Sequence, residues 1–255
     1  MRKTNHTRRL AALLLLLPLL CPAARGQQQA YKLAATENTR CDFTEVWPLN
    51  DLGSDILAQI EKRPEAKTAV VVYGLPPGDA IVYARGAKRW LTEMRGVAPP
   101  ERVLDIYGGP ATTKRLELWL VPAGAAPPPS APPVAGGRVT LFDTYDYWPG
   151  EFCGPDRPPS LLVFAEMLAK LPGWRGTIVV RPHVDPRRVP EGTNKDPSPL
   201  TRRQAARRAA GDRLYLTKTL GAGAGRVRAV VGAPATWAHA ELWLIPPAAT
   251  AANGR

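Results

Sequence analysis

The feature that most constrains this chain is an internal repeat. The segment Glu117–Pro122 (ELWLVP) recurs as Glu241–Pro246 (ELWLIP), and Pro110–Thr112 recurs as Pro234–Thr236 at the same offset of 124 residues. Four further blocks match in the same order: Trp90-Leu91 with Tyr215-Leu216, Thr68–Val72 with Thr177–Val180, Lys62–Pro64 with Lys170–Pro172, and Asp42 and Trp47-Pro48 with Asp143 and Trp148-Pro149. The offset grows from 101 to 125 residues along the chain, so the second copy carries insertions. Six blocks in one order indicate two diverged copies of one domain.

The repeat and the local composition divide the chain into five segments. We predict a secretory signal peptide at residues 1–26, repeat 1 at 27–122, a linker at 123–137, repeat 2 at 138–247 and a flexible tail at 248–255. The linker contains five prolines, which favour extended polyproline II structure and a semi-rigid spacer. Residues 27–38 are small and polar, and we expect them to be mobile.

The N-terminus has the pattern of a signal peptide. Basic residues precede the apolar run Leu10–Leu20, and Ala24-Arg25-Gly26 supplies small residues for cleavage before Gln27. The run is too short to span a bilayer, and no other stretch is apolar enough to do so. Cys21 raises the alternative of a lipoprotein, although lipid attachment usually requires small residues where Leu19 and Leu20 stand. We therefore expect an exported protein, periplasmic or outer-membrane associated, without a membrane span.

Each repeat has strand and helix patterns in alternation. In repeat 2, Val139–Phe142 and Thr177–Val180 are β-prone, and between them apolar residues recur at helical spacing until Pro172-Gly173. In repeat 1, a second helix has Ala80, Ala84, Ala87, Leu91 and Met94 on one face, and a last strand alternates Leu116, Leu118 and Leu120 with Glu117 and Trp119. The expected fold class is α+β: two tandem β-α-β-α-β domains, each a small mixed sheet covered on one face by two helices.

The charge of the expected mature protein is concentrated in its second half. Residues 27–137 carry 12 basic and 12 acidic residues, whereas residues 138–255 carry 17 and 10. A basic half can attract nucleic acid, an anionic membrane or an acidic polymer. An exported protein meets the last two, so we expect no nucleic-acid partner. Arginine-rich composition of the genome is the simpler alternative.

The order of these elements and several motifs resemble the C-terminal domain of the OmpA family, which binds peptidoglycan. In repeat 2, the segment Val179–Asp185 resembles the family's central strand with its Asp, Arg208–Leu216 its long helix, and Ala224–Val227 the exit from that helix. In repeat 1, Arg95–Val103 matches the same exit. The resemblance covers most of residues 42–122 and 139–246, and it rests on the order of the motifs. It implies a peptidoglycan-binding protein.

In that family an Asp and an Arg clamp the zwitterionic end of the peptidoglycan stem peptide, because a carboxylate takes its ammonium and a guanidinium its carboxylate. The resemblance assigns these roles to Asp185 and Arg208 in repeat 2. Repeat 1 departs from the pattern, with Leu75-Pro76 and Tyr83 at the two positions. The alternatives are a turn residue at Asp185 and a solvated basic helix face around Arg208. Repeat 2 is therefore the expected ligand-binding repeat, and the alternative function is a protein-interaction scaffold whose repeats have lost the ligand.

The sequence contains no recognisable catalytic or cofactor motif. Outside the signal peptide only His183, His239, Cys41 and Cys153 could supply histidine or cysteine ligands, and their spacing fits no metal site. We expect a non-catalytic protein without cofactor or metal. In an oxidising compartment Cys41 and Cys153 could form one disulfide between the repeats, or they could be two free thiols. His183 and Asp185 could share a strand face as an acid/base pair, although a chance spacing is the simpler interpretation.

Overall fold

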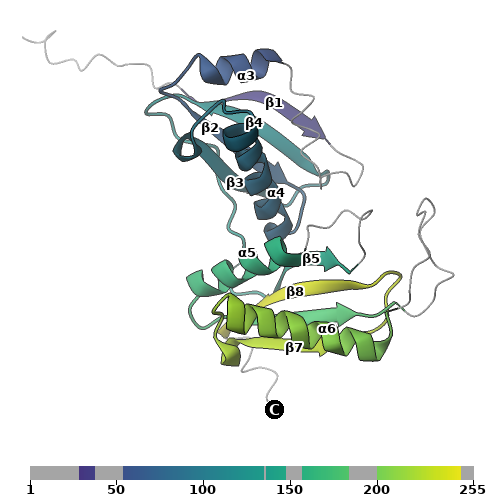
Figure 1. The fold of residues 1–255 in the computed structure, drawn as a ribbon. Coiled ribbons are helices and arrows are strands. Elements are labelled where there is room, and N and C mark those ends of the chain that lie inside the picture. Colours follow the sequence, from purple (N-terminus) through teal and green to yellow (C-terminus); the bar gives the residue numbers. More distant parts are fainter. Residues whose placement is uncertain (1–28, 38–53, 135, 148–156, 184–199, 248–255) are drawn as a thin grey trace, which may run out of the picture.

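The computed structural model describes residues 29–37, 54–134, 136–147, 157–183 and 200–247. It contains two similar α+β units in tandem, each with a mixed four-stranded sheet and helices against it (Figure 1). The expected fold class is therefore confirmed. None of the helices in the described part of the chain has the length and apolar character needed to cross a membrane.

Repeat 1 contains four strands and two main helices. In chain order they are β1 (Tyr31–Glu37), α3 (Ser54–Glu61), β2 (Lys67–Tyr73), α4 (Pro77–Arg89) with the π-helical turn η3 (Trp90–Met94), the 3-10 turn η4 (Pro100–Arg102), β3 (Val103–Gly109) and β4 (Arg115–Val121). The sheet order is β1-β4-β2-β3, with β2 and β3 parallel and β4 antiparallel to both β1 and β2.

Repeat 2 has the same elements in the same order. They are β5 (Thr140–Asp146), α5 (Arg157–Lys170), β6 (Arg175–Arg181), α6 (Arg202–Leu214) with η5 (Tyr215–Thr219), η6 (Ala224–Arg226), β7 (Val227–Val231) and β8 (His239–Ile245). The sheet order β5-β8-β6-β7 is equivalent to that of repeat 1. Each sheet has one strand more than the sequence predicted. The additional strands are β3 and β7, which directly follow the segments that the sequence analysis assigned to the helix exit.

The strand pairing corrects two parts of the repeat alignment. Both first strands pair with the last strand through one irregularity, between Lys32 and Ala34 in repeat 1 and between Leu141 and Asp143 in repeat 2. Asp143 is therefore equivalent to Ala34, and the alignment with Asp42 is wrong. The expectation that residues 27–38 are mobile is also wrong for Tyr31–Glu37, which forms strand β1.

The central strands are displaced by one residue from the sequence alignment. Val70 pairs with Leu118, and Ile178 pairs with Leu242, so Val70 and Ile178 are equivalent. Both side chains are fully buried. A shift of one residue would exchange the buried and exposed faces of a strand. Burial therefore fixes the pairing, whereas the similarity of neighbouring valines and isoleucines does not.

The apolar faces of the helices pack against the sheets and form the core of each repeat. Ala80, Ala84, Ala87 and Leu91 are buried as predicted, but Met94 is 71% exposed. Met94 ends the π-helical turn η3, whose wider winding rotates it off the apolar face. The strand alternation is confirmed, since Leu116, Leu118 and Leu120 all lie in the repeat 1 core.

A structural arginine recurs at the start of the third strand of each repeat. Arg226 donates hydrogen bonds to the carbonyls of Leu168 and Leu171, both at 2.6 Å, and of Trp174 at 2.9 Å. Arg102 does the same to the carbonyls of Arg63 (2.8 Å) and Ala66 (2.9 Å) in repeat 1. Each guanidinium thus satisfies backbone acceptors at and after the end of the first helix.

Helix α4 packs against both repeats. It covers β2 and β3 of its own sheet and also contacts α5 and β5 of repeat 2 (Figure 1). Arg85 forms a two-pronged ion pair with Glu166 across this interface, with N–O distances of 3.2 and 2.5 Å. Ile81 packs against the cores of both repeats. The repeats therefore share a specific interface in addition to the linker.

The linker is held against the edge of the first sheet. Ala131 donates its backbone N–H to the Tyr107 carbonyl on edge strand β3 at 2.8 Å. Ala131 also packs against the repeat 1 core, and Val134 packs against that of repeat 2. The proline-rich segment thus closes the β3 edge as well as spacing the two repeats.

Candidate functional site

Of the residues predicted to bind a ligand, the described part of the chain contains Arg208 alone. Asp185, Cys41 and Cys153 lie outside the described residues, so the Asp185–Arg208 pair and the Cys41–Cys153 disulfide both stay predictions. Arg208 lies about two turns into α6, further from the helix start than the sequence predicted. Its guanidinium lies 4.6 Å from the centre of the Tyr147 ring. This cation–π contact fixes the direction of an otherwise exposed side chain.

Helix α6 begins with a well-formed N-terminal cap. The Thr201 hydroxyl accepts the Gln204 backbone N–H, and the Gln204 side chain accepts the Thr201 backbone N–H. This reciprocal arrangement favours a helix start at Arg202. The cap therefore fixes which residues of α6 face the sheet, namely Ala205, Ala209 and Asp212, and which face solvent.

Beneath Arg208 lies a buried polar cluster that the sequence analysis missed. The Tyr145 and Tyr147 hydroxyls both donate to Asp212 Oδ2, at 2.5 and 2.6 Å. Burial, together with the neighbouring Tyr147 and Asp212, raises the pKa of Tyr145 well above its ordinary value. The sequence does contain a signal for this cluster. Asp212 occupies the α6 position that corresponds to the buried Ala87 of α4, on an otherwise apolar helix stripe. The cluster connects α6 to β5 and supports the ring on which Arg208 stacks.

His183 lies two residues beyond the end of β6, at the end of the described segment that leads toward Asp185. It is 2% exposed, and neither ring nitrogen has a hydrogen-bond partner among the described residues. Two buried unpaired ring nitrogens are uncommon and costly. The acid/base pair with Asp185 stays a prediction, because Asp185 lies outside the described residues.

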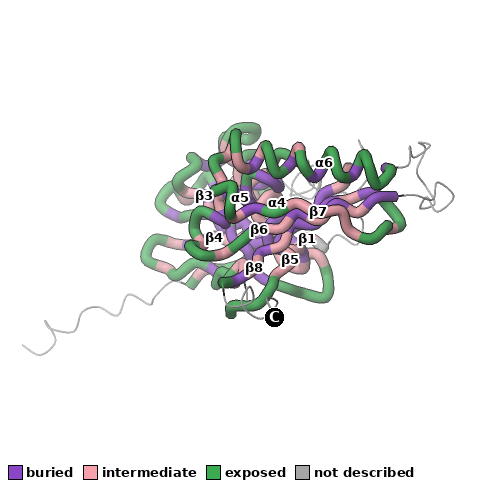
Figure 2. Tube along the Cα trace, turned by 90° about the horizontal axis from the view of Figure 1, so that it is seen from below, coloured by how far each residue is buried: buried purple, intermediate pink, exposed green. Residues whose placement is uncertain are grey.

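The outward face of α6 is strongly basic. Arg202, Arg203, Arg207 and Arg208 are exposed there, Arg213 is exposed but turns toward β7, and the one acidic residue of the helix, Asp212, is buried. In Figure 2 α6 lies at the periphery, with exposed residues along its length. Within the described ranges, none of these arginines forms an ion pair, whereas Arg85, Lys88 and Arg89 of α4 all do. Five exposed arginines of the described part of repeat 2 thus lie on one helix.

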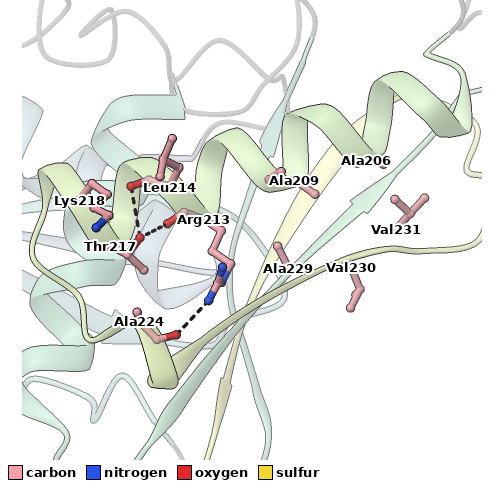
Figure 3. Close-up of a pocket in the computed structure, with 11 residues that line it drawn as sticks. Ala206, Ala209, Arg213, Leu214, Thr217, Lys218, Ala224, Ala229, Val230 and Val231 are labelled. Carbon is pink, nitrogen blue, oxygen red and sulfur yellow. Dashed lines mark hydrogen bonds between the residues drawn. The ribbon is translucent and has the colours of Figure 1, made fainter.

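Beside this basic face, a groove of about 570 Å³ separates α6 from edge strand β7 (Figure 3). Alanines form the helix wall, the segment Ala229–Val231 forms the strand wall, and Arg213 and Lys218 supply the charged side chains. Arg213 is fixed there by hydrogen bonds to the carbonyls of Val227 (2.9 Å) and Ala224 (3.2 Å). Within the part of the chain that the structure describes, no acidic residue lines the groove.

Two buried carboxyl groups meet where α4 of repeat 1 contacts β5 of repeat 2. Asp79 is 4% and Asp143 0% exposed. Asp143 Oδ1 accepts the Thr144 N–H at 2.7 Å, but Asp143 Oδ2 and Asp79 Oδ1 have no hydrogen-bond partner in the described part of the chain. Burial raises the pKa of Asp143 to about 7, although the Ser160 hydroxyl and the Thr144 N–H oppose this in part. Burial and the Asp143 charge also raise the pKa of Asp79 well above its usual range, with Asp146 adding and Lys114 opposing.

The repeated Glu-x-Trp segments have a structural role on the opposite face of each sheet. Trp119 Nε1 donates to Glu117 Oε2 at 2.9 Å, and Trp243 Nε1 donates to Glu241 Oε2 at 2.8 Å. Cations complete both clusters: Lys32 (2.6 Å) and Arg115 (2.9 Å) on Glu117, and Arg181 on Glu241. The segment that identified the repeat therefore encodes an internal ion-pair cluster.

In the described ranges, no group of three or more histidine, cysteine or acidic side chains is placed to hold a metal ion. Comparisons of the chain with protein-family models, with curated proteins and with solved structures found no match.

Proposed function

We propose that this chain is a non-catalytic binding protein of the cell envelope, in which repeat 2 carries the ligand-binding surface and repeat 1 is structural. The observation that carries the proposal is the difference between the two equivalent helices. Arg85, Lys88 and Arg89 of α4 pair with acidic side chains of the same chain, whereas the arginines of α6 lack acidic partners among the described residues. Such a surface suits an anionic or zwitterionic ligand.

The ligand we propose is the peptidoglycan stem peptide, held between Asp185 and Arg208. Support comes from the resemblance of repeat 2 to peptidoglycan-binding domains and from the Tyr147 ring, which fixes the Arg208 guanidinium at the surface. Each charged hydrogen bond to such a ligand contributes roughly 1.5–3 kcal/mol. Loss of either residue should therefore weaken binding at least about tenfold.

Sedimentation with purified peptidoglycan tests this proposal. At physiological salt, Asp185→Ala and Arg208→Ala should each reduce the bound fraction, and Arg208→Lys should not restore binding because an ammonium cannot make a bidentate contact. Arg95→Ala is the matched control, since Arg95 of repeat 1 stacks on Trp90 at 4.9 Å in a similar cation–π contact. Binding that both alanine variants retain at physiological salt would contradict the clamp.

The second candidate function is a protein-interaction scaffold, and the groove beside β7 favours it. The equivalent face of repeat 1, formed by α4 and β3, is covered by the linker and by α5 of repeat 2. One copy of this face therefore already works as a docking surface for protein. A wild-type chain that fails to bind peptidoglycan would leave the scaffold as the remaining function.

Export to the periplasm or outer membrane is part of the same proposal. It rests on the basic and apolar pattern of residues 1–26. N-terminal sequencing of protein recovered from the periplasm of a Gram-negative host should begin at or near Gln27. A mature chain that still starts at Met1 would contradict export and remove the reason to expect a disulfide.

A further inference from the structure

We propose that the groove between α6 and β7 is a docking site for an extended, acidic, alanine- and proline-rich peptide segment of a partner protein. The proposal is independent of peptidoglycan binding, because it uses the opposite side of α6 and neither Asp185 nor Arg208. It rests on what fills the equivalent place in repeat 1, on the open edge of β7, and on the charge of the groove.

Repeat 1 shows what this part of the fold binds. At the edge of β3, the Tyr107 carbonyl accepts the backbone N–H of Ala131, and the Ser130 hydroxyl lies 3.5 Å from the same carbonyl oxygen. Ala131 packs onto the core beside α4. An extended segment of proline, alanine and serine therefore closes the edge of the first sheet.

Among the described residues, no segment pairs with the equivalent edge in repeat 2. Gly232 donates its N–H to the Val180 carbonyl of β6 at 2.9 Å, and Val231 is the counterpart of Tyr107. In a parallel ladder, alternate residues direct both backbone groups to the same side. Ala229 and Val231 consequently present their N–H and C=O groups away from β6, into the groove that they line. An unpaired edge of this kind can pair with another chain.

Side-chain size explains why the groove of repeat 2, at about 570 Å³, is larger than the equivalent cavity of repeat 1, at about 180 Å³. The helix positions that carry Ile81 and Arg85 in α4 carry Ala206 and Ala210 in α6. Ile81 fills space between the two cores, and Arg85 reaches Glu166. Alanine at both positions leaves room for the side chains of a ligand beside the exposed strand edge (Figure 3).

The charge of the groove selects the ligand. Arg213 and Lys218 line it, no acidic residue among those described does, and Arg228 of β7 is exposed nearby. In repeat 1 the equivalent region contains Asp105 and Glu166 as well as Arg85 and Lys170. These charges balance, so a neutral segment suits repeat 1, whereas repeat 2 favours a segment that carries aspartate or glutamate.

The test is fluorescence anisotropy with the intact mature chain, residues 27–255. The probe is a labelled twelve-residue peptide of alternating alanine, proline and glutamate, and the comparison peptide has lysine in place of every glutamate. We expect the glutamate peptide to bind at least tenfold more tightly than the lysine peptide. Ala210→Trp, which fills the groove from an exposed helix position, should weaken binding at least tenfold. Ala111→Trp, on an exposed loop of repeat 1, is the matched control and should bind as wild type does.

Other occupants give different outcomes. Equal binding of both peptides, or an Ala210→Trp variant with unchanged affinity, would overturn the proposal. A tenfold gain in affinity on deletion of residues 248–255 would show that the chain's own tail fills the groove. Concentration-dependent dimerisation that Ala210→Trp abolishes would identify a second copy as the occupant. Each of the last two results would also refute a partner peptide.

Discussion

The buried carboxyl pair between the repeats makes the stability of the protein depend on pH. Asp143 has a pKa of about 7 in the folded chain, whereas an exposed aspartate has one near 3.8. Between pH 3.8 and pH 7, the folded state therefore keeps a proton on Asp143 that the unfolded state has released. Stability from the neutral form is complete below about pH 4 and is lost as the pH rises through 7.

The size of the effect follows from the shift. A difference of about three pKa units corresponds to about 4 kcal/mol, since each unit is worth about 1.4 kcal/mol. Most of this loss falls between pH 5 and pH 8, where the free energy of unfolding should drop by about 2–3 kcal/mol through Asp143. The pKa of Asp79 is raised in the same direction, so it adds to the loss.

Asp143→Asn tests this reasoning, because the amide keeps the shape and an acceptor for the Thr144 N–H but cannot ionise. Urea unfolding followed by tryptophan fluorescence at pH 5, 6, 7 and 8 should show the variant gaining on wild type by about 2–3 kcal/mol across the series. Asp55→Asn, at an exposed position of α3, is the control and should run parallel to wild type. If Asp143→Asn also runs parallel to wild type, Asp143 does not carry this linkage and the account of the interface is wrong.

Two further predictions each compare a substitution with a matched control. Gly78→Ala should destabilise the protein by about 1–3 kcal/mol, because an added Cβ would lie 2.7 Å from Asp143 Cβ. Gly86→Ala on the same helix should stabilise it by about 0.5–1 kcal/mol, because the added Cβ would have no atom within 4 Å. Thermal melts of the two variants would refute the interface if both shifted upward. Arg226→Ala should lower the free energy of unfolding by about 2–4 kcal/mol, since three backbone carbonyls lose a charged donor. Arg228→Ala, at an exposed position, should change it by under about 0.5 kcal/mol. Equal losses of stability for the two variants in urea titrations would refute the structural role of Arg226.

The sequence was sufficient to predict the fold class, because the repeat supplied each element twice. The apolar stripe of α5 and the alternation in β4 were both confirmed. Strand β1 was missed because its sequence, YKLAATE, has little β-prone character, and pairing with β4 supplies its stability. The sequence alignment of β2 with β6 was wrong by one residue. Similar amino acids in the two strands do not fix their register, whereas burial of one strand face does.

The candidate site was less predictable because it depends on distances between elements. Arg208 was identified from a resemblance, but its contact with Tyr147 joins α6 to the segment after β5. The groove arises from small residues at Ala206 and Ala210, which read as ordinary helix formers until a neighbouring strand edge is known. The Asp79–Asp143 pair brings one residue from each repeat together, and only the docking of α4 onto β5 creates it.

The central claim is that repeat 2, and not repeat 1, binds the ligand. The most direct measurement is an amide chemical-shift titration of the isotopically labelled mature chain, first with soluble peptidoglycan fragments and then with the acidic peptide. We predict that the two ligands together shift only amides of α6, β7 and the segments that flank Arg208, and that the amides of α4 and β3 stay unchanged. Shifts centred on repeat 1, or spectra that neither ligand changes, would contradict it.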